Sequence, residues 1–124
     1  MMSNSLTERD VITKSVLPAL EKSGWNIQTQ IFEELAFTDG KITIINSKPK
    51  RGERKRADIV LFYKPNIPLA VIEVKKNNLP IGSGIQQAIE YSEILDVPFA
   101  YSTNGLAFIE HSMLDTENSE NEIS

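Results

Sequence analysis

The feature that most constrains the fold is a pair of short apolar runs in the middle of the chain. Ile59–Tyr63 and Leu69–Ile72 are rich in β-branched and aromatic residues, and a Pro/Asn turn signal separates them. Such runs, bounded by turn residues, predict two adjacent strands of a buried sheet. An antiparallel pair around a four-residue loop, Lys64 to Ile67, would pair residues whose numbers sum to 131. We expect the chain to fold around this hairpin.

Three charged residues stand at the open end of the predicted hairpin. Asp58 opens the first strand, and Glu73 and Lys75 close the second. The predicted register sets Asp58 opposite Glu73, with Cβ atoms roughly 5 Å apart. Carboxylates this close repel each other, and a divalent cation between them removes that cost. Lys75 falls on the same face, because side chains alternate along a strand. The group predicts a metal-dependent phosphodiesterase site; an ion pair of Glu73 with Lys75 or Lys76 is the alternative.

Size and composition limit the class of protein. A chain of 124 residues is sized for one domain with one core. The sequence has no cysteine, which excludes disulfides and thiolate metal sites. No apolar run approaches the roughly 20 residues of a membrane span, and the polar N-terminus does not resemble a signal peptide. We therefore expect a cytoplasmic protein with no membrane partner.

The charge is distributed unevenly along the chain. The net charge is −4, but four acids lie in a polar C-terminal tail, and without them 13 acids balance 13 bases. Six bases lie in one short stretch: Lys48, Lys50, Arg51, Arg54, Lys55 and Arg56. Pro49 and Gly52 predict a loop there, and it leads directly to Asp58. DNA backbone contact beside the site is the favoured interpretation; a merely solvated loop is the alternative.

The N-terminal segment predicts a helix. Ser5 and Glu8 fit a capping box, and apolar residues follow at helical spacing. Pro18 should kink or split this helix, and Gly24 is a plausible end. Glu8 is expected mainly as the capping carboxylate, with a supporting role in the site as the alternative.

The rest of the chain predicts further strands, one more helix and a tail. Strands are expected at 25–32, 41–45, 97–101 and 106–109, a DG hairpin turn at 39–40, a loop at 77–84 and a helix at 85–95. Gln87 and Tyr91 would share one face of that helix. Glycines at its start leave N–H groups that could receive a phosphate. From residue 112 the apolar pattern is lost, and we expect a frayed tail or linker.

Several short motifs follow one another in a specific order. They are Pro18–Leu20, Ser23–Trp25, Phe37–Gly40, Arg54–Asp58, Pro65–Ala70, Ile72–Lys75, Gln86–Ala88, Leu95–Pro98 and Ser102–Gly105. In this order the sequence resembles the N-terminal nuclease domain of the restriction (R) subunit of type I restriction enzymes. The resemblance covers about residues 5 to 111.

The resemblance implies a fold and a set of domains. The fold would be α/β, a restriction-endonuclease-like PD-(D/E)XK core with a mixed central sheet flanked by helices. Residues 1–111 would form the nuclease domain, and 112–124 an acidic tail or truncated linker toward a missing ATPase motor. ATP would bind only in that motor, because no G-x-x-x-x-G-K-[S/T] occurs here.

The resemblance also implies roles for individual residues. Asp58 matches the metal-binding aspartate of these nucleases, and Glu73 and Lys75 match their E-x-K pair, although Ala57 replaces the usual proline. Gln87 and Tyr91 match the Q-x-x-x-Y motif of type I nuclease domains. Mg²⁺ would be held by Asp58, Glu73 and the Val74 carbonyl. Lys75 would stabilise the phosphate charge or position the attacking water.

The implied function is Mg²⁺-dependent hydrolysis of double-stranded DNA without base readout of its own. Modification and specificity subunits would be partners through the full-length protein. Two alternatives stay open: a nuclease fold that binds DNA or a partner subunit without turnover, and a structure-selective resolvase. A purely structural domain would leave the converging charges without an explanation.

Overall fold

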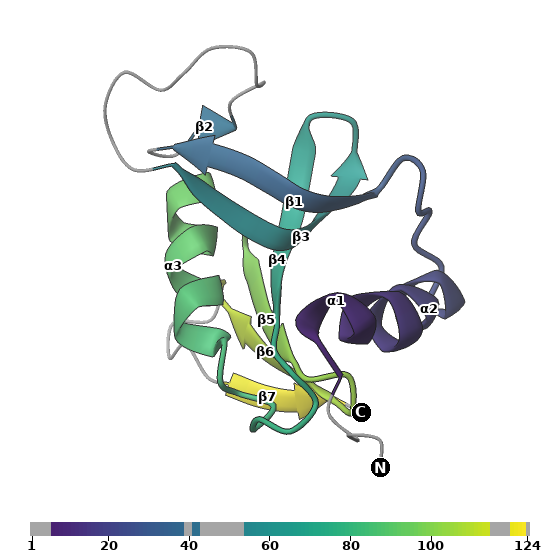
Figure 1. The fold of residues 1–124 in the computed structure, drawn as a ribbon. Coiled ribbons are helices and arrows are strands. Elements are labelled where there is room, and N and C mark those ends of the chain that lie inside the picture. The colour runs from purple at the N-terminus through teal and green to yellow at the C-terminus, as the bar shows by residue number, and fades with distance from the viewer. Residues whose placement is uncertain (1–5, 39–40, 43–53, 115–119, 124) are drawn as a thin grey trace.

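The computed structural model describes residues 6–38, 41–42, 54–114 and 120–123. They form a mixed seven-stranded sheet in the order β2-β1-β3-β4-β5-β6-β7, with helices on both faces (Figure 1). Only β4 and β5 run parallel; the other neighbours are antiparallel. The strands are β1 Ile31–Thr38, β2 Lys41–Ile42, β3 Lys55–Lys64, β4 Ile67–Val74, β5 Phe99–Thr103, β6 Phe108–Ser112 and β7 Glu120–Ile123. The predicted α/β class with a mixed, helix-flanked sheet is confirmed.

The central hairpin of β3 and β4 has the predicted register. Ile59 pairs with Ile72, and Lys64 pairs with Ile67, so these paired numbers sum to 131, although the register shifts locally where Phe62 pairs with Pro68. The predicted four-residue loop is wrong, because both strands continue into it and the turn is only Pro65 and Asn66. Asn66 has φ of 67°, a left-handed conformation that asparagine tolerates. The register is unchanged because each strand gains one residue.

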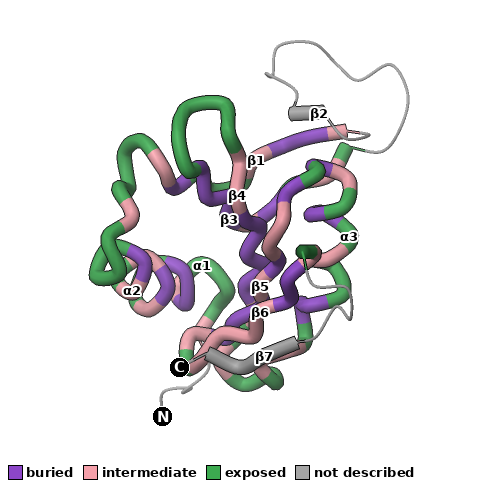
Figure 2. The backbone as a smooth tube through the Cα atoms, turned by 180° about the vertical axis from the view of Figure 1, so that it is seen from behind, coloured by how far each residue is buried: buried purple, intermediate pink, exposed green. Residues whose placement is uncertain are grey.

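Alternating side chains of the central strands build a core on each face of the sheet. One core joins Ile59, Leu61 and Ile72 to the N-terminal helical segment. The other joins Val60 and Val71 to α3, Ile85–Leu95. Figure 2 shows the middle of these strands buried and their connecting turn exposed. Two covered faces explain why both runs are apolar almost throughout.

The N-terminal helical segment is split before Pro18. It consists of α1, Glu8–Val11, a π-helical turn, Ile12–Val16, and α2, Leu17–Lys22. Pro18 has no N–H to donate to the fourth residue before it, and the wider turn avoids that missing bond. Its far end is a Schellman motif, in which Gly24 N–H donates to Glu21 O and Trp25 N–H to Leu20 O. The predicted split and end are confirmed.

The predicted capping box is shifted by two residues. Thr7 is the N-cap: its hydroxyl accepts from the Asp10 N–H at 3.0 Å, and the Asp10 carboxylate accepts from the Thr7 N–H at 3.3 Å. The prediction of Ser5 with Glu8 is therefore wrong. Both pairs have the right three-residue spacing, so the spacing alone does not choose between them.

The outer strands differ from the sequence-based ranges. The predicted strand 25–32 is wrong up to residue 30: residues 27–30 form a turn, in which the Asn26 side chain accepts the N–H groups of Gln28 and Thr29. The C-terminal strands β5 and β6 begin two residues later than predicted. β7 pairs with β6 inside the predicted tail, so an unstructured tail is wrong for residues 120–123. The nuclease-domain boundary and the linker toward a motor stay predictions.

Candidate active site

Asp58 and Glu73 meet where the β3–β4 ladder ends. The Asp58 N–H donates to Glu73 Oε2 at 3.0 Å, and the Val74 N–H donates to Asp58 Oδ2 at 2.8 Å. The last regular backbone pair before them is Ile59 with Ile72. The side chains thus continue the ladder in place of the backbone. The predicted opposition of the two carboxylates is confirmed.

Burial favours the neutral forms of both acids. Glu73 is only 3% exposed, and this burial, with the nearby Asp58 charge, raises the pKa of Glu73 to about 8. Burial likewise raises the pKa of Asp58, although its bond from the Val74 N–H opposes the shift. Lys75 opposes both shifts through its charge. A positive charge beside the pair would oppose these shifts, as that of Lys75 does.

The N-terminus of α3 packs directly on Glu73 and Lys75. A Cβ on Gly84, the N-cap of α3, would lie 3.1 Å from Glu73 Cβ, 3.2 Å from Lys75 Cε and 3.2 Å from Ser102 Oγ. The Gly84 N–H donates to Ser102 Oγ, and this hydroxyl donates to Ile81 O at 2.7 Å. Ser102 is the partner of Glu73 across the parallel β4–β5 pair. Lys75 therefore lies on the same face as Glu73, as predicted, under the loop before α3.

Gln87 and Tyr91 face the same side of the site from α3. Gln87 Nε2 donates to the Tyr91 hydroxyl at 2.9 Å, which confirms their shared face. Tyr91 is buried edge-on against Phe37, with ring centroids 5.0 Å apart. Its pKa is raised by burial first and by the Glu73 charge second. The hydroxyl therefore lies within electrostatic reach of the acidic pair.

The predicted basic stretch is only partly described. Lys48, Lys50 and Arg51 lie outside the described residues. Arg54 is exposed just before β3, and Lys55 and Arg56 are the first two residues of that strand, so the predicted loop is wrong for these two. The Arg56 side chain is 61% exposed. Within the described part, exposed basic groups thus lead along β3 to Asp58.

Glu8 does not join the acidic pair. It is exposed at the first position of α1, and the structure gives it no hydrogen bond or ion pair to the described residues. The capping role that the sequence suggested for it belongs to Asp10. No contact among the described residues supports a role for Glu8 in the site.

The local sequence does not indicate that Arg9 contacts Glu34, the residue opposite Asp58 in β1. Arg9 of α1 donates to Glu33 Oε1 at 2.6 Å and to Glu34 Oε2 at 2.8 Å. Glu34 lies opposite Asp58 in β1, and its charge is one of the influences that raise the pKa of Asp58, after burial. Ser102 was missed as well, because its position beside Glu73 depends on the parallel β4–β5 pairing. Long-range pairing of this kind leaves no local pattern.

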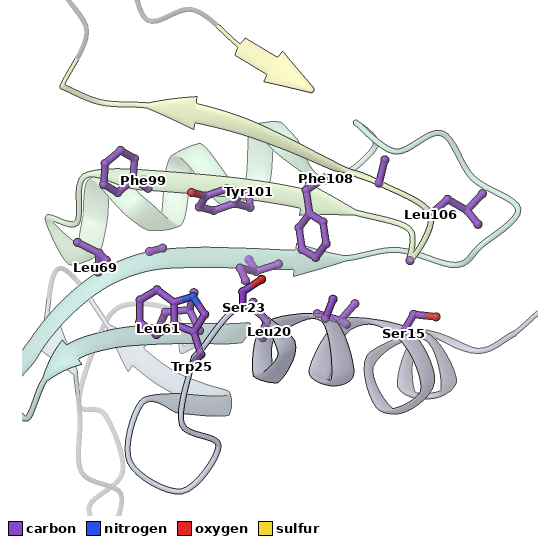
Figure 3. Close-up of a pocket in the computed structure, with 16 residues that line it drawn as sticks. Ser15, Leu20, Ser23, Trp25, Leu61, Leu69, Phe99, Tyr101, Leu106 and Phe108 are labelled. Carbon is purple, nitrogen blue, oxygen red and sulfur yellow. The ribbon is translucent and has the colours of Figure 1, made fainter. Parts of the chain in front are cut away.

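An apolar hollow lies on the other face of the sheet. Its volume is about 400 Å³, and it lies between the N-terminal helical segment and strands β3 to β6. Figure 3 shows Phe99, Tyr101 and Phe108 on the strand side and Leu20, Ser23 and Trp25 on the helical side. No carboxylate lines it. The acidic pair is thus separate from this apolar cavity.

The acidic pair has no third acidic or histidine side chain beside it in the described part of the chain. No three His, Cys, Asp or Glu side chains converge there on a common point. A metal bound to the pair would therefore take few ligands from the described side chains.

No described helix is long and apolar enough to cross a bilayer.

Comparison with known proteins gives a consistent assignment. Residues 27–124 match the family model for the type I restriction enzyme R protein N terminus (HSDR_N). The chain is 52% identical over 106 residues to the type I restriction enzyme EcoAI endonuclease subunit of Escherichia coli, covering 86% of the chain and 13% of that subunit. A solved structure, described as a fragment of an HsdR subunit of a type I restriction enzyme from Vibrio vulnificus YJ016, matches with a TM-score of 0.81. It is 45% identical and covers 98% of this chain and 24% of its own. The chain thus spans a small part of these relatives, and it belongs to the family of type I restriction enzyme R protein N-terminal regions.

Proposed function

We propose that this chain is the endonuclease part of a type I restriction R subunit and hydrolyses DNA at a Mg²⁺-dependent PD-(D/E)XK site. The observation that carries the proposal is the Asp58–Glu73 pair with Lys75 on the same face. A buried carboxylate and a half-buried one beside it, both with raised pKa values, are costly without a counter-charge. Such a cost is common where a protein binds a metal or performs acid–base chemistry.

The ligand chemistry fits Mg²⁺. This ion prefers oxygen ligands and is commonly bound by one or two carboxylates together with water and substrate phosphate. Asp58 and Glu73 supply the carboxylates. The Val74 N–H points toward β3, and in an antiparallel strand the carbonyl of the same residue points the same way, so the Val74 carbonyl is the third candidate oxygen. When bound, the ion supplies polarisation of the scissile phosphate and lowers the pKa of the attacking water.

The remaining residues bind and orient the substrate. Lys75 either stabilises negative charge on the phosphate or holds the attacking water. Gln87 and Tyr91 support the site from α3, since their hydrogen-bonded pair lies within electrostatic reach of Glu73. The bases that precede Asp58 hold the DNA backbone: Lys48, Lys50, Arg51, Arg54, Lys55 and Arg56. This chain then does not recognise the DNA sequence that it cleaves. The modification and specificity subunits supply target recognition in the cytoplasmic enzyme.

Metal binding is the first test of the site. We would titrate Mn²⁺, as a surrogate for Mg²⁺, into the wild-type chain and the Asp58→Ala variant by calorimetry. We expect binding to the wild type and its loss in the variant, with an unchanged circular dichroism spectrum. Equal binding to both would overturn the assignment of Asp58. Glu93→Ala is the matched control, because Glu93 is an exposed acid of α3.

Cleavage is tested in the full-length R subunit with its partner subunits. Lys75→Ala should abolish DNA cleavage, while Lys76→Ala should retain it. Lys76 is the matched control because it is the next residue and is exposed. Full cleavage by the Lys75→Ala enzyme would sink the proposed mechanism. Metal binding by the wild-type chain without cleavage in the assembled enzyme would favour a nuclease fold that binds DNA without turnover.

A further inference from the structure

Glu34 interrupts the pairing of β1 with β3 beside Asp58. Glu33 pairs with Ile59 and Leu35 pairs with Ala57, but the intervening pair of Glu34 with Asp58 is missing from this ladder. Glu34 has φ of 53°, a left-handed conformation inside a strand. For a residue other than glycine this costs about 1 kcal/mol or more. The conformation persists only if its surroundings hold it.

The interruption releases the backbone N–H of Asp58. The Phe62 N–H donates to Gln30 O of the segment leading into β1 at 2.8 Å. Hydrogen-bonding direction repeats every two residues along a regular strand, so in an unbroken ladder the Asp58 N–H would face β1 and donate to Glu34. It donates instead to Glu73 Oε2 at 3.0 Å. The left-handed turn at Glu34 thus withdraws the regular backbone partner of Asp58 and leaves its N–H for the carboxylate.

Two arginines contact Glu34, and Arg9 makes the closer contact. Arg9 bonds Glu33 at 2.6 Å and Glu34 at 2.8 Å, although neighbouring side chains of a regular strand point to opposite faces. One guanidinium can bond both only where the alternation is broken. Arg56 adds a longer contact to Glu34, 3.6 Å from Nη1 to Oε1. We call Arg9, Glu33 and Glu34 the Arg9 clamp.

We infer that the Arg9 clamp positions the acidic pair. It keeps Glu34 in the left-handed conformation, and the Asp58 N–H then donates to Glu73 and not to β1. Arg9 and Glu34 act through Asp58 and are not catalytic residues. The side chains of the clamp are 30% to 52% exposed. Each exposed ion pair contributes at most about 1 kcal/mol, so the two together are of the same order as the cost of the left-handed conformation of Glu34 and would mainly fix the local geometry. That this geometry serves metal binding rests on the proposed function.

The test uses variants that favour or oppose the left-handed conformation. Glu34→Val opposes it, because β-branched residues rarely adopt positive φ. Glu34→Gly permits it without help from Arg9. Arg9→Gln removes the clamp, and the double variant Arg9→Gln/Glu34→Gly should restore the conformation. Lys14→Gln is the matched control for Arg9→Gln, because Lys14 is an exposed base of the same helical segment.

Two readouts separate the inference from the proposed function. The first is the amide resonance and hydrogen exchange of Asp58 by NMR, without metal. The second is the Mn²⁺ affinity by calorimetry. In Glu34→Val and Arg9→Gln we expect the Asp58 amide to shift and the affinity to fall by about tenfold or more, the usual effect of losing an outer-shell partner. Glu34→Gly and the double variant should stay within about twofold of the wild type, well below the tenfold loss.

The outcomes are distinguishable. An Asp58 amide and Mn²⁺ affinity that are unchanged in Glu34→Val would overturn the positioning role. Failure of the double variant to recover the Arg9→Gln loss would overturn it as well, because the loss would then not act through the Glu34 backbone. If the wild type binds no Mn²⁺, the proposed function fails, and the amide readout alone decides the inference. Glu34 is exposed, so its variants are expected to fold.

Discussion

Asp58 and Glu73 are linked through the backbone of one and the side chain of the other. The Asp58 N–H donates to Glu73 Oε2 at 3.0 Å, while the Asp58 carboxylate accepts the N–H of Val74, the residue after Glu73. Each acid is therefore fixed by the strand that carries its partner. The arrangement holds two carboxylates together against their repulsion, and this has measurable consequences.

The raised pKa of Glu73 predicts a pH-dependent stability. The pKa of Glu73 is about 8 in the folded chain against an ordinary value of 4.5, so folding favours the protonated form. This contribution is fully present below the ordinary pKa and is lost as pH rises through about 8. Without metal, Tm should fall between pH 5 and pH 8, by roughly 4 °C per kcal/mol. Thermal melts by circular dichroism over this range provide the measurement.

The control for this prediction is Glu73→Gln, which keeps the shape and removes the titration. Its Tm should vary less over the same pH range. A slope equal to that of the wild type would mean that other groups cause the pH dependence. Saturating Mn²⁺ should flatten the wild-type curve as well, if the proposed metal site forms.

Gly84→Ala should disturb both packing and metal binding. The added methyl group would lie 3.1 Å from Glu73 Cβ and 3.2 Å from Lys75 Cε, which forces α3 away from the site. We expect a loss of about 1–3 kcal/mol in the free energy of unfolding, as for other overpacked sites, together with weaker Mn²⁺ binding. Ser83→Ala is the control, because Ser83 is the exposed preceding residue. A Gly84→Ala chain with wild-type melting and affinity would contradict the close packing.

Tyr91→Phe should separate packing from function. The ring keeps its edge-on contact with Phe37, and only the hydroxyl that accepts from Gln87 is lost. Stability should change by about 1 kcal/mol or less, while DNA cleavage by the assembled enzyme falls. Tyr63→Phe is the control, since Tyr63 is 57% exposed. Undiminished cleavage by the Tyr91→Phe enzyme would restrict Tyr91 to a packing role.

Arg56→Ala should weaken binding to DNA of any sequence. If Arg56 neutralises one phosphate, the slope of log affinity against log salt becomes shallower by about 0.9. Fluorescence anisotropy with a duplex at several salt concentrations measures this slope. Lys22→Ala, at the exposed end of α2, is the control. An unchanged slope in Arg56→Ala would place the DNA elsewhere.

Much of the centre of the fold was predictable because its signals are local. The two apolar runs, the turn residues between them and the two-residue alternation determine the β3–β4 register and the meeting of Asp58 with Glu73. The helix 85–95 was predicted with its observed bounds, since its periodicity agrees with its packing. Strand limits farther out were wrong where side-chain turns compete with extended backbone, as at Asn26.

The sequence by itself determined the hairpin, its charged end and the resemblance to R subunits, because each depends on the order of neighbouring residues. Only the tertiary structure decided what surrounds the acidic pair. Gly84 and Ser102 reach it through the parallel pairing of β4 with β5, and Arg9 acts through the backbone of Glu34. These contacts join residues distant in the chain, and a local pattern cannot encode them. The left-handed Glu34 was likewise invisible, because its conformation is held by Arg9 against the preference of the residue itself.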